Sequence, residues 1–230
     1  SEMCIRDSMT PDRRAARRTA DPSPDHGTRV NLTRARGERT REVILEEATL
    51  LFSTYGYRGT SLRDISERVG ISHPGMLHHF SRKETLLQAV LERAARHFEE
   101  LIDDFVETAQ EPAAIRDWDA VRQYQSVMFA VVRAEAVEKD HPGHEAIVGM
   151  QTMAEEKLTA LFEMYEEKGW LDEGASPEWI ARSTVAMWTG VFMRDALMGD
   201  GLYDHDLSIF LRMFVIPLRE ADPFTPTSGK

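Results

Sequence analysis

The sequence predicts an all-α fold, and three observations support this class. Apolar residues recur at the three- and four-residue spacing of an amphipathic helix in one segment after another. The 10 prolines lie largely between these segments, where they end helices. Runs that alternate apolar and polar residues, as a half-buried strand does, are almost absent.

The N-terminal part is expected to begin as a disordered tail and to continue as a helix. Residues 1–30 are rich in proline, aspartate, arginine and serine and lack apolar periodicity. A helix is predicted from about residue 38 to 55, with Gly56 and Gly59 ending it. Its apolar face consists of Ile44, Ala48, Leu51, Phe52 and Tyr55.

Two short helices joined by a tight turn are predicted between Thr60 and Lys83. Ser61 can cap the first of them, with Asp64 in the capping-box position three residues later. Gly70 suits a left-handed turn, and Ser72 offers a second N-cap. This pattern is typical of a helix-turn-helix that enters the major groove of DNA.

Five further helices are predicted after this unit. Ser81 is expected to cap a long one that no glycine or proline interrupts, so that it can connect two domains and transmit movement. The last helix is unusually apolar. Their approximate bounds are 83–109, 119–138, 144–168, 177–199 and 206–218.

The net charge of −11 conceals an uneven distribution. Residues 29–96 carry 12 Lys and Arg against 8 Asp and Glu, whereas residues 97–230 carry 11 against 26. Only the end of the chain that holds the helix-turn-helix is therefore expected to attract phosphate. Arg36 and Arg39, just before the first predicted helix and at its start, are candidates for contacts along the DNA backbone or in the minor groove.

Other classes of protein are not favoured. No apolar run approaches the roughly 18 residues of a membrane span, and the single cysteine suits a reducing cytoplasm. The chain has no GxSxG, glycine-rich phosphate loop or HExxH, so we predict neither an enzyme nor a cofactor. His73, His78 and His79, like His141 and His144, lack the further ligands of a zinc site, so no metal is predicted.

Residues 38–87 resemble the DNA-binding domain of the tetracycline-repressor-like (TetR) family of bacterial regulators. The resemblance rests on three stretches that keep their register over fifty residues: FSTYGYRGTSLRDIS, ERVGIS and HHFSRKETLL. The rest of the chain resembles the family only in its helical layout. The resemblance implies a homodimeric regulator of transcription, usually a repressor that a small molecule releases from DNA.

The resemblance also implies roles for single residues. Thr60 and Ser61 match phosphate contacts at the start of a helix, and His79 and Lys83 match positions that touch the DNA backbone. Leu77 stands where the family commonly has a tyrosine that meets a phosphate. The recognition helix and its start contribute Ser72, His73, Pro74, Gly75, Met76 and His78.

The readout of bases is expected to be largely apolar. Pro74 and Gly75 leave the middle of the recognition helix with little side chain, so the backbone can approach the groove closely. We predict that Met76 contacts a thymine methyl group and that arginine–guanine pairing is absent.

The acidic body is expected to hold an effector pocket and a dimer interface. Flexible methionines beside aromatic rings suit an adaptable apolar pocket, although ordinary core packing is the simpler explanation of any single one of them. Pairing with a symmetry mate would cover the apolar last helices. The pocket candidates are Tyr124, Gln125, Met128, Phe129, Met150, Met153, Trp188 and Phe192, and the interface candidates are Trp179, Val185, Ile209, Phe210, Met213 and Phe214.

The sequence thus predicts four segments: a disordered tail at 1–30, a DNA-binding domain at 31–83, an effector-binding and dimerisation domain at 84–220, and a disordered end at 221–230. The expected partners are double-stranded operator DNA, a small apolar effector and a second copy of the chain, with no membrane. One alternative stays open: a regulator that activates transcription or acts without a ligand.

Overall fold

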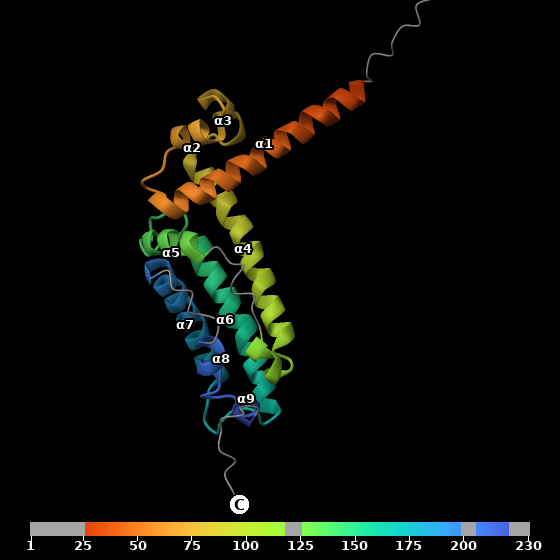
Figure 1. Cartoon of the computed structure of the whole chain (residues 1–230), viewed down its shortest axis with the longest axis vertical. Helices are drawn as coiled ribbons and strands as arrows, with labels where there is room; N and C mark the ends of the chain where they lie inside the picture. The colour runs from red at the N-terminus through yellow and green to blue at the C-terminus, as the bar shows by residue number, and fades with distance from the viewer. Residues whose placement is uncertain (1–25, 118–125, 199–205, 221–230) are drawn as a thin grey trace, which may run out of the picture. The chain divides into compact units, whose positions relative to one another are not determined.

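The computed structural model describes residues 26–117, 126–198 and 206–220 (Figure 1). The chain divides into two compact units, residues 1–39 and residues 40–230, which we treat separately. Throughout the described residues the regular structure is helical, apart from one isolated bridge between Leu171 and Val215. The predicted all-α class is therefore confirmed. No helix among these residues is long and apolar enough to cross a lipid bilayer.

Helix α1 spans His26–Tyr55 and so begins inside the stretch that the sequence predicts to be disordered. Its described side chains before Thr40 are mostly exposed, and Arg34 and Glu38 form an ion pair one turn apart, with Nε and Oε1 separated by 3.0 Å. Apolar periodicity reports burial rather than helicity, so an exposed polar helix gives no such signal. Residues 1–25 lie outside the described part of the chain.

Helices α2 (Leu62–Val69) and α3 (His73–His79) follow α1 and pack around a shared core. Each helix contributes at least one fully buried side chain to this core, and the residue after α3 contributes an aromatic ring. The largest of these buried side chains are Ile44, Phe52, Ile65, Met76 and Phe80.

Helix α4 spans Lys83–Thr108, close to the predicted bounds. Its buried stripe runs from Leu86 to Phe105 along one face, as predicted. The prediction that Ser81 caps it is wrong, because Arg82 is the N-cap residue and makes no capping hydrogen bond through its side chain.

The body consists of a short 3-10 helix, η1 (Pro112–Asp117), and helices α5 (Ser126–Glu135), α6 (His144–Glu167) and α7 (Pro177–Met198). Helix α6 packs against α4 and α7, and α5 packs against α7 (Figure 1). The helix predicted at 119–138 corresponds to α5, and residues 118–125 lie outside the described part. Phe105 and Trp188 meet edge to face in the core, with ring centroids 5.5 Å apart.

The predicted single helix at 206–218 is wrong, because the structure has two short helices there, α8 (Asp206–Leu211) and α9 (Ile216–Glu220). The chain between them pairs with the loop before α7. The amide of Asp172 donates to the carbonyl of Phe214 at 3.0 Å, and the amide of Ile216 donates to the carbonyl of Trp170 at 2.8 Å. Arg219 completes the contact with a two-pronged ion pair to Asp172.

Candidate DNA-binding surface

Local hydrogen bonds fix both ends of α2. Ser61 and Asp64 form the predicted capping box: the Asp64 amide donates to the Ser61 hydroxyl at 3.2 Å, and the Ser61 amide donates to the Asp64 carboxylate at 2.9 Å. The Asp64 carboxylate also accepts a hydrogen bond from the Ser61 hydroxyl at 2.7 Å, and this bond, together with the one from the Ser61 amide, holds the pKa of Asp64 below its usual value. At the other end Gly70 adopts φ +76°, the left-handed conformation that glycine reaches without strain. The turn between α2 and α3 is therefore encoded locally.

The start of α3 is equally well defined. The Ser72 hydroxyl accepts a hydrogen bond from the Gly75 amide at 3.2 Å, and Pro74 lies in the first turn, where a missing N–H costs nothing. A Cβ atom on Gly75 would lie 3.2 Å from the Ser72 hydroxyl oxygen, so a larger residue there would require the Ser72 side chain to shift by a few tenths of an ångström.

Helix α3 has one buried and one exposed face. Met76 is fully buried and Phe80 almost so, whereas His73, Pro74, Leu77 and His78 are exposed. Residues at these spacings lie together on one side of a helix. The exposed face is the part of α3 that can enter a groove.

The predicted contact between Met76 and a thymine methyl group is wrong. Its side chain has no exposed surface and packs in the core with Ile65 and Phe80. Leu77, with 41% of its surface exposed, is the apolar side chain that the helix presents to solvent. Sequence spacing alone did not show which of these two neighbours is buried. In the structure, Met76 lies one helical turn after Ser72, and Leu77 lies one turn after the exposed His73.

Two further predicted contacts are turned inward. Thr60 is buried, and its hydroxyl donates to the carbonyl of Gly56 at 2.9 Å. The Lys83 ammonium donates to the carbonyls of Tyr57 and Thr60, both at 2.9 Å, and lies 4.2 Å from the centre of the Tyr57 ring. The predicted phosphate contacts through these two side chains are therefore not supported, because both side chains stabilise the loop between α1 and α2.

The other predicted DNA contacts occupy several different environments. Ser61, Ser72, His73, Pro74 and His78 are exposed, and Gly75 and His79 are half-buried. Burial is the main cause that lowers the pKa of His79, and the charges of the neighbouring His78 and Arg41 lower it further. At neutral pH we therefore expect His79 to act through hydrogen bonds. Arg36 and Arg39 are exposed residues of the unit 1–39, and their role stays a prediction.

One cation beside the recognition helix was not predicted as a contact. Arg82 is exposed and is the N-cap residue of α4. It follows Phe80 by two residues, so the buried ring fixes the backbone that carries it. The family resemblance assigned the backbone contact to Lys83, so the neighbouring Arg82 was not considered.

The candidates for an effector pocket are only partly described. Tyr124 and Gln125, together with the side chains of Met128, Phe129 and Phe192, lie outside the described part. Among the remaining candidates, Met150 and Trp188 are buried core residues, and Met153 is half-buried against the core. A groove of about 420 Å³ over α6 and α7 is lined by other residues, among them Glu155, Glu163 and Arg182.

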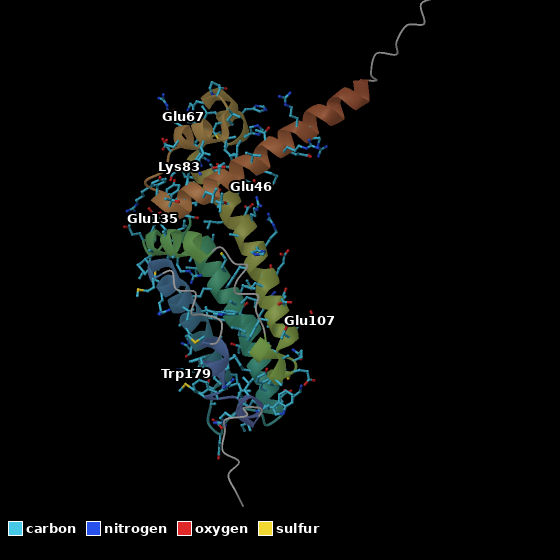
Figure 2. All side chains as sticks on the ribbon, in the orientation of Figure 1. Glu46, Glu67, Lys83, Glu107, Glu135 and Trp179 are labelled. Carbon is cyan, nitrogen blue, oxygen red and sulfur yellow. The ribbon has the colours of Figure 1, made fainter. Side chains whose placement is uncertain are left out.

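The interface candidates also divide into two groups. Val185 is buried among its own subunit's core residues, so it cannot serve as a surface contact, and this prediction is wrong. The other five cluster around α7 and α8, with Trp179 labelled in Figure 2. Trp179, Ile209 and Met213 are each at least 50% exposed, and Phe210 and Phe214 are half-buried beside them.

Beneath the loop between α1 and α2 lies a buried histidine. The Nδ1 atom of His141 accepts a hydrogen bond from the Gly143 amide at 3.1 Å, and its Nε2 has no hydrogen-bond partner among the described residues. Tyr57 packs edge to face on the His141 ring, with ring centroids 5.1 Å apart. Burial together with Glu84 raises the pKa of Tyr57 to about 12, so the Tyr57 ring is neutral at physiological pH.

Acid is expected to destabilise the protein through His141. Burial lowers its pKa, and this effect, with the charges of Arg58 and His144, outweighs the opposite effect of Glu135 and Glu138. Since the unfolded chain binds this proton first, stability is lost as the pH falls from the unfolded value of about 6.5 toward the lower folded value. Between pH 7.5 and 5.5, the free energy of unfolding measured in urea should decrease less for His141→Gln than for the wild type. Parallel pH profiles would contradict the prediction.

Comparisons with known proteins agree with this architecture. The family profile described as "Bacterial regulatory proteins, tetR family" matches residues 44–90. The HTH-type transcriptional repressor AcnR of Corynebacterium diphtheriae is 36% identical over 87 residues, which are 36% of this chain and 46% of that protein. The HTH-type transcriptional repressor ComR of Escherichia coli K12 is 36% identical over 85 residues, covering 35% and 39%. The chain thus matches less than half the length of these curated relatives.

Solved structures extend the similarity to the body. The SmeT–triclosan complex aligns with a TM-score of 0.60 at 21% identity, covering 84% of this chain and 96% of that one. At this identity the likeness concerns the fold, whereas the match over residues 44–90 concerns the sequence of the helix-turn-helix itself. Residues 44–90 therefore form a DNA-binding domain of the TetR family of bacterial regulatory proteins, in a chain whose overall fold matches that of SmeT.

Proposed function

We propose that the chain is a sequence-specific transcriptional repressor that binds a palindromic operator as a homodimer and leaves it when a small apolar effector binds. The observation that carries this proposal is the two-sided α3, with Met76 in the core and His73, Pro74, Leu77 and His78 exposed on the other face. A dimer of such units presents two recognition helices about 34–36 Å apart, or a multiple of that, to successive major grooves.

The effector part of the proposal has separate support. Among the proteins that share this fold, SmeT forms a complex with the small molecule triclosan. In this chain α4, α6 and α7 pack through Phe105, Met150 and Trp188, a polarisable set that can adapt to an apolar guest. Release of bound DNA by an apolar compound is the test of this part.

The DNA-binding part is tested by selecting operators from random DNA with the full chain. We expect a palindrome in which one thymine per half-site contacts Leu77. Replacing that thymine by uracil removes one methyl group, whose burial contributes about 0.8 kcal/mol, or about a fourfold change in affinity. The wild type should lose this factor, and Leu77→Ala should not respond to the replacement.

A matched control separates readout from stability. Leu50→Ala removes a similarly exposed leucine from α1, with 47% of its surface accessible, and should bind the thymine and uracil operators as the wild type does. Recovery of no preferred sequence would refute the proposed function. An equal uracil effect in the wild type and in Leu77→Ala would refute the role of Leu77 alone.

A further inference from the structure

The loop between α1 and α2 forms a cradle for one carboxylate. Gly56 adopts φ +74°, and the next two amides converge on Glu135. The Tyr57 amide donates to Oε2 at 2.6 Å, and the Arg58 amide donates to Oε1 at 3.2 Å. A Cβ atom on Gly56 would lie 2.6 Å from Oε1, so only glycine leaves room for the carboxylate. Successive amides of this kind bind anions, and here the anion belongs to the same chain.

The carboxylate comes from the body. Glu135, labelled in Figure 2, is the last residue of α5. Its side chain is only 20% exposed. Two residues earlier, the Arg133 guanidinium donates to the Thr189 hydroxyl of α7 at 3.1 Å and reaches Gln151 of α6 at 3.5 Å. The final turn of α5 therefore holds the body through Arg133 and the loop through Glu135.

The loop in turn positions the DNA-binding helices. Lys83, at the start of α4, donates to the carbonyls of Tyr57 and Thr60, and the Tyr57 hydroxyl donates to Glu84 at 2.9 Å. Thr60 directly precedes Ser61, the N-cap of α2. A displacement of the loop therefore displaces the starts of both α2 and α4.

We infer that the seat of the Glu135 carboxylate on the amides of Tyr57 and Arg58 is a joint through which the packing of α5 on α7 sets DNA affinity. This inference rests on the proposed function, because it names the regulation of the same DNA-binding surface. The joint adds a second connection between the body and the DNA-binding helices, beside the continuous chain of α4. Arg133, Glu135 and the 56–58 loop act in series along it, so that loss of either side chain interrupts the same path.

The chain offers a matched control for this joint. Glu138 lies three residues after Glu135 and pairs with the side chain of Arg58, but both partners are 60% exposed. Exposed ion pairs contribute little, so this carboxylate should not matter. Glu135→Gln keeps the size of the side chain and removes the charge, and Glu138→Gln makes the same change outside the cradle.

The test measures the affinity of the full chain for an operator selected with the wild type. We expect Glu135→Gln to weaken binding about tenfold, within the usual range of coupling between sites, and Glu138→Gln to change it less than twofold. Arg133→Met should weaken binding severalfold in the wild-type background and have no further effect beside Glu135→Gln. Equal effects of the two glutamate variants, or independent effects of Arg133→Met and Glu135→Gln, would overturn the joint.

A measurement on the unmodified protein covers the case in which a variant folds poorly. Because coupling is reciprocal, DNA bound at α3 must also change the amide hydrogen exchange of residues 56–58 and of the end of α5. Unchanged exchange at both places in the complex would overturn the inference while leaving the DNA-binding proposal intact. Failure to select any operator would instead refute the proposed function on which the joint depends.

Discussion

Phe80→Ala is expected to unfold the recognition helix and to abolish specific DNA binding. The Phe80 ring is 1% exposed, and the Arg41 guanidinium covers it at 4.4 Å from the ring centre. Removing a buried phenylalanine costs about 3–5 kcal/mol, because the transfer energy is lost and a cavity remains. The free energy of unfolding of a whole domain is only about 5–15 kcal/mol, so this loss is a large fraction of it. The seven-residue helix α3 has one other buried anchor, Met76, and is therefore expected to unfold.

Two measurements check this prediction. Urea unfolding followed by circular dichroism gives the loss of stability, and hydrogen exchange of the α3 amides shows whether the loss is local. Leu77→Ala is the control, since an exposed side chain on the same helix should change operator recognition and leave the free energy of unfolding almost unchanged. Wild-type exchange of the α3 amides in Phe80→Ala would show that the ring does not anchor the helix.

The elements that the sequence predicts best are those that short-range chemistry decides. The capping box of Ser61 and Asp64, the left-handed Gly70 and the cap at Ser72 each involve residues at most three positions apart or a single backbone conformation. The long α4 follows from a regular apolar stripe. These features therefore emerge from composition and spacing alone.

The inward-facing site residues could not be predicted in the same way. Lys83 is drawn to carbonyls more than twenty residues away in the chain, and Thr60 closes the end of α1 with its own hydroxyl. Both residue types are common phosphate contacts, so type and position favoured the wrong role. Only the tertiary partner decides which role a polar side chain takes.

The prediction of a single last helix was wrong because of pairing between distant segments of the chain. Residues 206–218 have the composition of one buried helix, yet the backbone around Val215 pairs with the loop at Leu171 and splits it. The Glu135 cradle is a similar case, because its carboxylate and its amides lie 78 and 77 residues apart. Gly56 was predicted as a helix end, whereas the space it leaves for Glu135 was visible only in the fold.

Replacing Ile209 and Met213 together by aspartate is expected to convert the protein into monomers. These residues are 55% and 62% exposed, and Phe214, the residue after Met213, packs edge to face on Trp179, which is 50% exposed. Exposed apolar side chains of this size are costly in water, and a two-fold interface would cover them. Analytical ultracentrifugation should show a dimer for the wild type and a monomer for the double variant.

Loss of the dimer should also strongly reduce the affinity for DNA. A monomer reads one half-site, so its affinity for the palindrome should fall on the order of 10³-fold, toward the level of non-specific binding. Val148→Asp places one aspartate on an exposed apolar residue of α6, 45% accessible, and should leave both dimerisation and DNA binding as they are. The thermal midpoint of the wild type should rise with protein concentration, and that of the double variant should not, because only the dimer couples folding to association. A double variant that stays dimeric would place the interface elsewhere on the body.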